Sequence, residues 1–359
     1  MQPGIDKACG EGLMPDSLEA LAALGFDLNQ DLGHIETALL RGIRFLNDQA
    51  ASPKIRTHNP TTEAPFPAGP GRGIRRTILH QLLLDRAVSL GVRVHWQNSV
   101  QSIAQTSASS LHLPGSTLVH TNRQTLRARY LIGADGHQSR IAKWAGLEKS
   151  STHSCRIGLR QHYAIAPWTD FVEVYWSRHG QAYVTPISSS EVCVAFISNA
   201  KFPSSAAALK HFPALAHHLA SAQPNGSSRG SVTFGRSLHR VTTGNIALIG
   251  DASGSVDAVT GEGMALCFRQ AAALAAALKA NDLAAYQHAH RDIQRIPSLM
   301  SRSLLLMDRH PRLRARTLNT FERNPKLFSS LLQVHIGHSP IQLFGFDGLL
   351  ATSLHILAS

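Results

Sequence analysis

The fold class is decided by the stretch Ile246-Ala-Leu-Ile-Gly-Asp-Ala-Ser-Gly-Ser-Val-Asp-Ala-Val-Thr-Gly-Glu-Gly263. Its first four residues are apolar without interruption, which is typical of a parallel strand that is covered on both faces. Gly250-Asp251 then falls at the carboxyl end of this strand, the edge at which open α/β sheets bind ligands. The stretch therefore predicts an α/β fold with a ligand site at a strand end.

The second half of this stretch predicts a turn that opens a helix. Thr260 is expected to cap a helix beginning near Gly261, so that the amide N–H groups of the first turn face an anion or an electron-rich ring. Gly261 and Gly263 let a flat or phosphorylated group approach the backbone closely. Asp251 is placed to accept hydrogen bonds from the hydroxyls of a sugar-like chain. Taken alone, the stretch fits an ordinary strand–turn–helix corner equally well.

Three further segments give this stretch a context. Residues 246–263 resemble the second flavin fingerprint of the FAD-dependent monooxygenase and geranylgeranyl reductase superfamily. The segment Tyr-Leu-Ile-Gly-Ala-Asp-Gly-His-Gln-Ser-Arg at residues 130–140 resembles the Asp-Gly motif of the same superfamily, and residues 7–15 and 73–80 are similar to two more of its segments. All four follow one another in the family's order, so the resemblance implies an FAD enzyme.

The resemblance also implies a set of cofactor-binding residues, namely Arg75, Arg76, Asp135, Gly136, Arg140, Gly250, Asp251, Gly261, Glu262 and Gly263. In the family, the aspartate that matches Asp251 holds the ribityl chain of FAD, and the turn that matches residues 261–263 lies beside the isoalloxazine ring. Asp135 and Arg140 are expected near the phosphates and ribose, where carboxylate and guanidinium can orient each other; a surface ion pair is the alternative. Only one of Arg75 and Arg76 can point toward the cofactor.

The expected architecture is an incomplete Rossmann-like FAD-binding domain, an antiparallel β-sheet substrate domain and a helical C-terminal region. The sequence has no Gly-x-Gly-x-x-Gly motif, so we expect the first βαβ unit, about 30 residues, to be missing. Either the true start codon lies upstream and the sequence is a truncated reading, or the gene has lost its adenine-binding half and is decaying or repurposed. The expected domain boundaries are 1–30, 71–150 and 231–285 for the FAD-binding domain, 31–70 and 151–230 for the substrate domain, and 286–359 for the helical region.

Periodicity gives a coarse secondary structure. It predicts helices over 17–24, capped by Ser17 or Asp16, and over 77–90. It predicts strands over 35–39, 43–46, 92–96 and 126–132, and a proline-rich connector over 60–70. Residues 155–198 alternate between apolar and polar, which predicts an antiparallel sheet with one open face. This sheet is expected to roof the substrate pocket.

Composition narrows the class of protein. The chain has 359 residues, of which 43% are hydrophobic, enough for a large core and two or more domains. It has no apolar run near the ~18 residues of a membrane span and no signal peptide at its start. Its four cysteines are scattered, which favours the cytoplasm and argues against a zinc site, and we assign no metal.

The net charge of +12 suggests an anionic partner or surface. Nucleic acid is not expected, because aromatics make up 6% of the residues and no known DNA-binding spacing occurs. Much of the positive charge lies in residues 286–359, where leucine-rich runs alternate with arginines such as Arg295, Arg302 and Arg309. This composition fits basic amphipathic helices on an anionic membrane surface, or equally a helical cap with a solvated basic face.

The sequence favours an NAD(P)H-linked hydroxylase that acts on a hydrophobic small molecule. A reductase of carbon-carbon double bonds is the first alternative, with Glu262 and Tyr183 as possible proton donors, and a flavin-free remnant is the second. The chemistry would belong chiefly to the flavin, so no catalytic side chain is assigned. The sequence departs from both the reductases and the hydroxylases of the superfamily. Residues 181–186 depart from the geranylgeranyl reductase signature, and Gly254 and Ala258 stand where hydroxylases commonly have histidine and proline.

Overall fold

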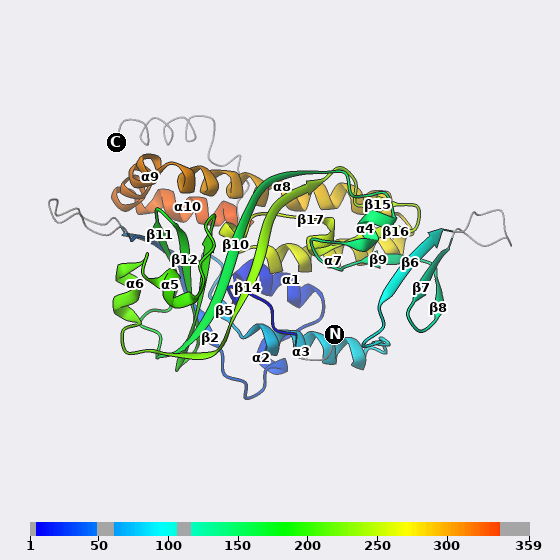
Figure 1. Cartoon of the computed structure of the whole chain (residues 1–359), viewed down its shortest axis with the longest axis horizontal. Coiled ribbons are helices and arrows are strands. Elements are labelled where there is room, and N and C mark those ends of the chain that lie inside the picture. Colours follow the sequence, from blue (N-terminus) through cyan, green and yellow to red (C-terminus); the bar gives the residue numbers. More distant parts are fainter. Residues whose placement is uncertain (1–4, 49–60, 106–115, 338–359) are drawn as a thin grey trace.

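The structure, a computed structural model, describes residues 5–48, 61–105 and 116–337 (Figure 1). It has the expected mixed α/β fold, with a large sheet, a small parallel pair of strands and a helical C-terminal region. The division into three domains at the expected boundaries stays a prediction.

The largest element is an eight-stranded sheet in the order β17-β14-β10-β13-β12-β11-β3-β4. Neighbouring strands are antiparallel except β11 and β3, which are parallel. Figure 1 shows its two longest strands, β10 and β14, running side by side across the molecule. The bounds are β3 (Gly42–Asn47), β4 (Thr61–Pro65), β10 (Ser150–Ala164), β11 (Phe171–Ser177), β12 (Gly180–Ser188), β13 (Glu191–Ser198), β14 (Gln223–Leu238) and β17 (Gly254–Ser255).

The middle of this sheet is covered on both faces. Helices α5 (Ser205–Leu209) and α6 (Pro213–His218) pack on one face, where Val194 and Phe212 belong to one apolar cluster. The C-terminal helices pack on the other face through Leu305 and Leu318. All eight residues of β13 are buried. The predicted antiparallel sheet is present, but the prediction of an open face was wrong for β13. Helices α5 and α6 cover the face that carries Val194, and the other face meets the N-terminal segment and a cavity, where Cys193 Sγ donates to the Cys9 carbonyl over 3.6 Å and Ala195 lines the wall.

The parallel pair consists of β9 (Leu131–Gly133) and β16 (Ile246–Leu248), with the short strand β15 (Thr242–Thr243) on the outer side of β16. Leu248 lies opposite Gly133, so the carboxyl ends of both strands reach the same edge. All of β16 is buried, as its unbroken apolar sequence predicts.

Two more sheets of three strands complete the described β structure. Their strands are β1 (Gly12–Leu13), β5 (Gly71–Gly73) and β2 (Ala38–Leu40), and β6 (Val100–Gln105), β7 (Thr117–Thr121) and β8 (Thr125–Ala128). The N-terminal half also holds the helices α1 (Pro15–Ala23), α2 (Leu28–Asp31), α3 (Arg76–Ser89) and α4 (Arg140–Trp144).

Several local predictions were wrong. The first helix begins at Pro15 without a side-chain cap, because proline suits its first position and Asp16 instead pairs with Arg269. The connector over 60–70 contains β4, whose alternating burial follows from its pairing with β3. Residues 92–96 form no strand, since no neighbouring strand pairs with them. The strand expected over 126–132 is divided between β8 and β9.

The C-terminal helices are α7 (Gly263–Ala280), α8 (Leu283–Arg309), α9 (Pro311–Arg323) and α10 (Pro325–His335). Prolines at their first positions start α9 and α10, and the Asn324 side chain accepts a hydrogen bond from Leu327 N–H at the start of α10. None of the helices in the described part of the chain combines the length and apolar character needed to cross a membrane.

Candidate functional site

A cavity of about 1020 Å³ lies where the parallel pair, the large sheet and the C-terminal helices meet. One part of its wall consists of the turns that follow β9 and β16. Another part is apolar and comes from the large sheet and from α8, α9 and α10, with Val172, Val174, Met300, Leu304, Phe321 and Phe328 among its side chains. The sheet thus roofs the cavity, as the sequence predicted.

The tips of β9 and β16 meet at this cavity. Ile249 N–H donates to the Gly133 carbonyl over 2.9 Å, which extends the strand pairing by one residue. Directly beyond this bond, Ala134 and Gly136 from one strand and Gly250 and Asp251 from the other line the cavity wall.

Asp135 is turned away from the cavity toward helix α4. Its carboxylate accepts hydrogen bonds from Ser139 Oγ (2.5 Å), Arg140 N–H (2.8 Å) and Ile141 N–H (3.2 Å), which satisfies the free amides at the start of α4. The Arg140 guanidinium stacks 4.5 Å from the Trp144 ring centroid instead of pairing with Asp135. The expected contact between carboxylate and guanidinium is therefore absent, because the helix N-terminus takes up the carboxylate.

Asp251 lies in a rigid turn and has an exposed side chain. The turn is held by Gly250 N–H, which donates to Gln270 Oε1 over 2.8 Å, and by Ser253 Oγ, which donates to the Gly250 carbonyl over 2.8 Å. Gly250 has a φ of 59°, a conformation that favours glycine. The Asp251 carboxylate is left to accept hydrogen bonds from a ligand in the cavity.

The glycine turn before α7 also faces the cavity. Gly261 has a φ of 70°, and a Cβ atom added at Gly261 or Gly263 would meet nothing within 4 Å. The helix begins at Gly263, two residues after the predicted start, but Thr260 does not cap it; the Thr260 hydroxyl instead accepts from Glu262 N–H over 3.3 Å. No side chain in the described part of the chain caps α7, so its first amides and positive dipole end are available to a ligand.

Glu262 points away from the cavity into the protein. It is 1% exposed, and neither carboxylate oxygen has a hydrogen-bond partner among the described residues. Burial, aided by the nearby Asp16 carboxylate and opposed by Arg269, raises the pKa of Glu262 well above its usual value. Burial therefore favours the protonated form of Glu262, and its side chain does not line the cavity.

His335 is the neighbour of Glu262 and lines the cavity. Its Nδ1 lies 3.7 Å from Glu262 Oε2, and its Nε2 lies 3.1 Å from the Thr260 carbonyl, to which only a protonated nitrogen can donate. Burial is the largest influence on the pKa of His335 and lowers it. The imidazole is therefore neutral, with its proton on Nε2 and its Nδ1 lone pair toward Glu262.

The two arginines before α3 have different surroundings. Arg76 lines the cavity, whereas Arg75 forms a bidentate ion pair with Glu191 on the large sheet. Asn225 also donates to Glu191, over 2.7 Å. Of the pair, only Arg76 is placed to meet a cofactor.

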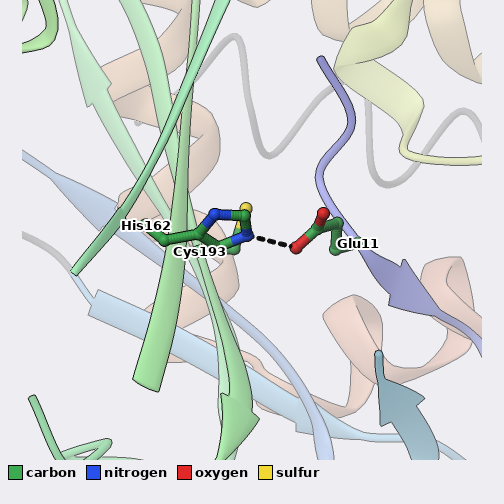
Figure 2. A group of neighbouring side chains, drawn as sticks. All are labelled: Glu11, His162 and Cys193. Carbon is green, nitrogen blue, oxygen red and sulfur yellow. Dashed lines mark hydrogen bonds and ion pairs between the residues drawn. The ribbon is translucent and has the colours of Figure 1, made fainter. Parts of the chain in front are cut away.

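A buried polar cluster lies next to Arg76 at the cavity wall (Figure 2). Glu11 and His162 point toward each other from the N-terminal segment and from β10, with 2.6 Å between His162 Nε2 and Glu11 Oε2. The second oxygen of Glu11 accepts from Arg76 N–H over 3.0 Å at the start of α3. Glu11 itself lines the cavity and has a φ of 59°, unusual for a residue with a side chain. The cluster thus fixes the N-terminal segment against both α3 and the sheet.

Cys193 completes a group with metal-ligating atoms within 4.8 Å of one another. Arg160 Nη1 lies 2.7 Å from His162 Nδ1, and because arginine only donates, Nδ1 must accept and the ring proton must sit on Nε2. A metal ion would need that nitrogen deprotonated. Burial and the Glu11 carboxylate also raise the pKa of the Cys193 thiol, which disfavours a thiolate ligand. The ring proton on Nε2 and the raised thiol pKa favour a hydrogen-bonded cluster over a metal site.

Sequence reasoning missed His335, His162 and Asp257. Asp257 is fully buried, pairs with Arg156 over 3.2 Å and accepts from Val259 N–H over 3.0 Å, so it anchors the turn before Gly261 to the sheet. Asp257 lies within residues 246–263, and its position one residue before a turn could have indicated that its side chain holds the turn in place. The two histidines carry no local signal, because their partners lie 75 and 151 residues away in the sequence.

The turns after β9 and β16 lie within a region of the chain that matches a known protein family. Residues 70–284, more than half of the chain, match the family described as "FAD binding domain". This match includes the turns after β9 and β16, as well as Arg75 and Arg76. No curated protein matches the chain in sequence.

Solved structures share the fold at low sequence identity. The flavin-dependent brominase Bmp2 aligns with a TM-score of 0.77 and 16% identity, over 100% of this chain and 90% of Bmp2. A flavoprotein/dehydrogenase from Cytophaga hutchinsonii gives 0.78 and 16%, over 99% and 92% of the two chains. PqsL from Pseudomonas aeruginosa, a probable FAD-dependent monooxygenase, gives 0.63 and 17%, over 92% and 91%.

Proposed function

Because the chain belongs to the FAD binding domain family, we propose that it is an FAD-dependent oxidoreductase, and specifically an NAD(P)H-linked monooxygenase that hydroxylates a hydrophobic small molecule. One observation carries this proposal: a single cavity combines the glycine-rich turns after two parallel strands with an apolar wall large enough for a second ligand. The scattered free cysteines favour a reaction in the cytoplasm.

The residues of the turns fit FAD by their chemistry. The exposed Asp251 carboxylate would accept hydrogen bonds from the ribityl hydroxyls, and the bare backbone at Gly261 and Gly263 would admit the flat ring. The uncapped amides of α7 would stabilise negative charge on that ring. When bound, FAD would supply the redox chemistry, taking electrons from NAD(P)H and enabling oxygen or hydride transfer to the substrate.

The apolar part of the wall supports a hydrophobic substrate. Among the cavity-lining residues of α8, α9 and α10, only His335 is titratable, and the others are Met300, Ser303, Leu304, Leu306, Met307, Leu313, Thr317, Phe321, Phe328, Leu331 and Leu332. A charged substrate would lose its hydration there without gaining an ion partner. These side chains would instead exclude water from the reacting groups.

A double-bond reductase is the second candidate. Such an enzyme needs a proton donor near the substrate, and two side chains at or beside the cavity are candidates for this role. Tyr183 lines the cavity and donates its O–H to the Val259 carbonyl over 2.7 Å, and burial raises its pKa. Glu262 is a second candidate donor, because burial raises its pKa and its Oε2 lies 3.7 Å from Nδ1 of the cavity residue His335.

Product analysis tests the proposal. Purified protein loaded with FAD would be supplied with NAD(P)H, dioxygen and a panel of neutral apolar compounds, and the products weighed by mass spectrometry. A monooxygenase adds one oxygen atom, whereas a reductase adds two hydrogen atoms and works without dioxygen. Protein that takes up no FAD would leave the flavin-free remnant as the correct description.

A further inference from the structure

The outer face of α8 carries a stripe of arginines interrupted by leucines. The exposed residues over 291–309 lie on one face of the helix, and we call them the α8 stripe: Arg291, Asp292, Arg295, Leu299, Arg302, Ser303, Leu306 and Arg309. Four arginines face one acid, so the stripe is cationic. Leu299 and Leu306 are 44% and 49% exposed, so two large apolar side chains lie among the arginines of this face.

The α8 stripe also forms part of the rim of the cavity. Ser303 and Leu306 are exposed and at the same time line the cavity wall. Met300 and Leu304, on the inner side of the same helix turns, continue the wall inward. The apolar part of the cavity therefore reaches the protein surface between the arginines of α8.

We propose that the α8 stripe docks on an anionic lipid surface, so that a lipid-soluble ligand passes directly between the bilayer and the cavity. The arginines would lie at the level of the anionic headgroups, and Leu299 and Leu306 would enter the interface between headgroups and acyl chains. The helix would lie on the surface and not cross it. Docking itself does not require the proposed function; only the passage of a hydrophobic ligand rests on it.

Charge and composition select a lipid surface over nucleic acid. Residues 291–309 contain no aromatic side chain, whereas proteins that bind single strands stack bases on aromatic rings. The exposed Leu306 at the cavity rim, and Leu299 on the same face of α8, have no counterpart in a phosphate-backbone contact, but they match the apolar boundary of a bilayer.

Vesicle co-sedimentation of the full chain tests the docking. Phosphatidylcholine vesicles that contain phosphatidylglycerol are expected to bind the protein, pure phosphatidylcholine vesicles to bind it much less, and added salt to weaken binding. The double variant Arg295→Gln/Arg302→Gln should lower the affinity about 25-fold, since each arginine near a charged surface contributes about a fivefold factor. Leu299→Ser/Leu306→Ser should lower vesicle affinity on the order of tenfold while leaving heparin binding unchanged.

The matched control is Arg93→Gln/Arg123→Gln, which removes the same charge from exposed positions after α3 and between β7 and β8. Its vesicle affinity should stay within about twofold of the original chain. An equal loss in the control and the α8 variant would overturn the proposal, because binding would then follow net charge alone. So would tight heparin binding without vesicle binding. Protein that binds FAD but no vesicles refutes docking alone; protein that docks but takes up no FAD refutes the proposed function alone.

Discussion

Glu262 Oε2 and His335 Nδ1 lie 3.7 Å apart in a buried site beside the cavity, and neither atom has another hydrogen-bond partner among the described residues. Burial favours the neutral form of both side chains, because it raises the pKa of Glu262 and lowers that of His335. A protonated Glu262 is a donor and His335 Nδ1 is an acceptor, so a small movement would join them by a hydrogen bond.

This pair predicts a pH-dependent stability. Above the usual carboxyl pKa of 4.5, the folded chain keeps a proton on Glu262 that the unfolded chain releases, so stability falls as the pH rises toward the folded pKa. Glu262→Gln removes this loss and should gain stability over the original chain between pH 5 and pH 8, by on the order of 1 kcal/mol or more. Urea unfolding at several pH values measures it. The exposed Glu19→Gln is the control, and parallel pH curves for all three proteins would contradict the prediction.

His335 in the same site predicts that the folded chain loses stability at acid pH. His335 has a folded pKa below its usual 6.5, so the unfolded chain binds a proton first and stability falls as the pH drops through 6.5. His335→Gln should flatten that part of the curve, by on the order of 1 kcal/mol between pH 7 and pH 5. An unchanged acid limb in urea unfolding would show that His335 titrates normally.

Gly73 should tolerate no side chain. A Cβ atom there would lie 1.7 Å from the Pro186 carbonyl oxygen, on the backbone of β12, which cannot move without disturbing the large sheet. Gly73→Ala is expected to cost about 3 kcal/mol or more of unfolding free energy. Gly10→Ala, where a Cβ meets nothing within 4 Å, is the matched control and should cost less than about 1 kcal/mol. Equal denaturation midpoints for the two variants would refute the close packing of β5 on β12.

His162 should matter for stability through its hydrogen bond. His162→Ala leaves the buried Glu11 carboxylate without its 2.6 Å donor and opens a small cavity, which should cost about 2 to 4 kcal/mol. His153→Ala removes an exposed histidine from the same strand and should cost less than about 0.5 kcal/mol. Chemical denaturation of both variants decides, and a loss below about 1 kcal/mol for His162→Ala would contradict the described cluster.

Zn²⁺ should not stabilise the folded protein through the cluster of Glu11, His162 and Cys193. With the ring proton on His162 Nε2 and a protonated thiol at Cys193, Zn²⁺ has no free ligand pair there. Thermal unfolding with and without Zn²⁺ should give the same midpoint. A stabilisation by Zn²⁺ that Cys193→Ala abolishes would show that the cluster is a metal site after all.

The sequence pattern predicted those secondary-structure elements whose burial follows from their own residues. The apolar run before Gly250 predicted β16, and the alternation over 155–198 predicted the sheet. Both predictions were possible because the pattern of apolar residues in a strand reflects which of its faces are buried. Side-chain direction was less predictable. Asp135 and Glu262 stand in recognised motifs, yet the free amides of α4 hold one and the packing of α10 buries the other. The expected loss of the first βαβ unit stays a prediction.

The most direct test of a flavin site at the tips of β9 and β16 is equilibrium binding of FAD to the purified chain, followed by its visible spectrum after gel filtration. The chain should retain FAD, Asp251→Ala should bind it about 10- to 100-fold more weakly, and the exposed Asp85→Ala should bind it unchanged. A colourless chain, or equal affinity in the Asp251 and Asp85 variants, would contradict the account.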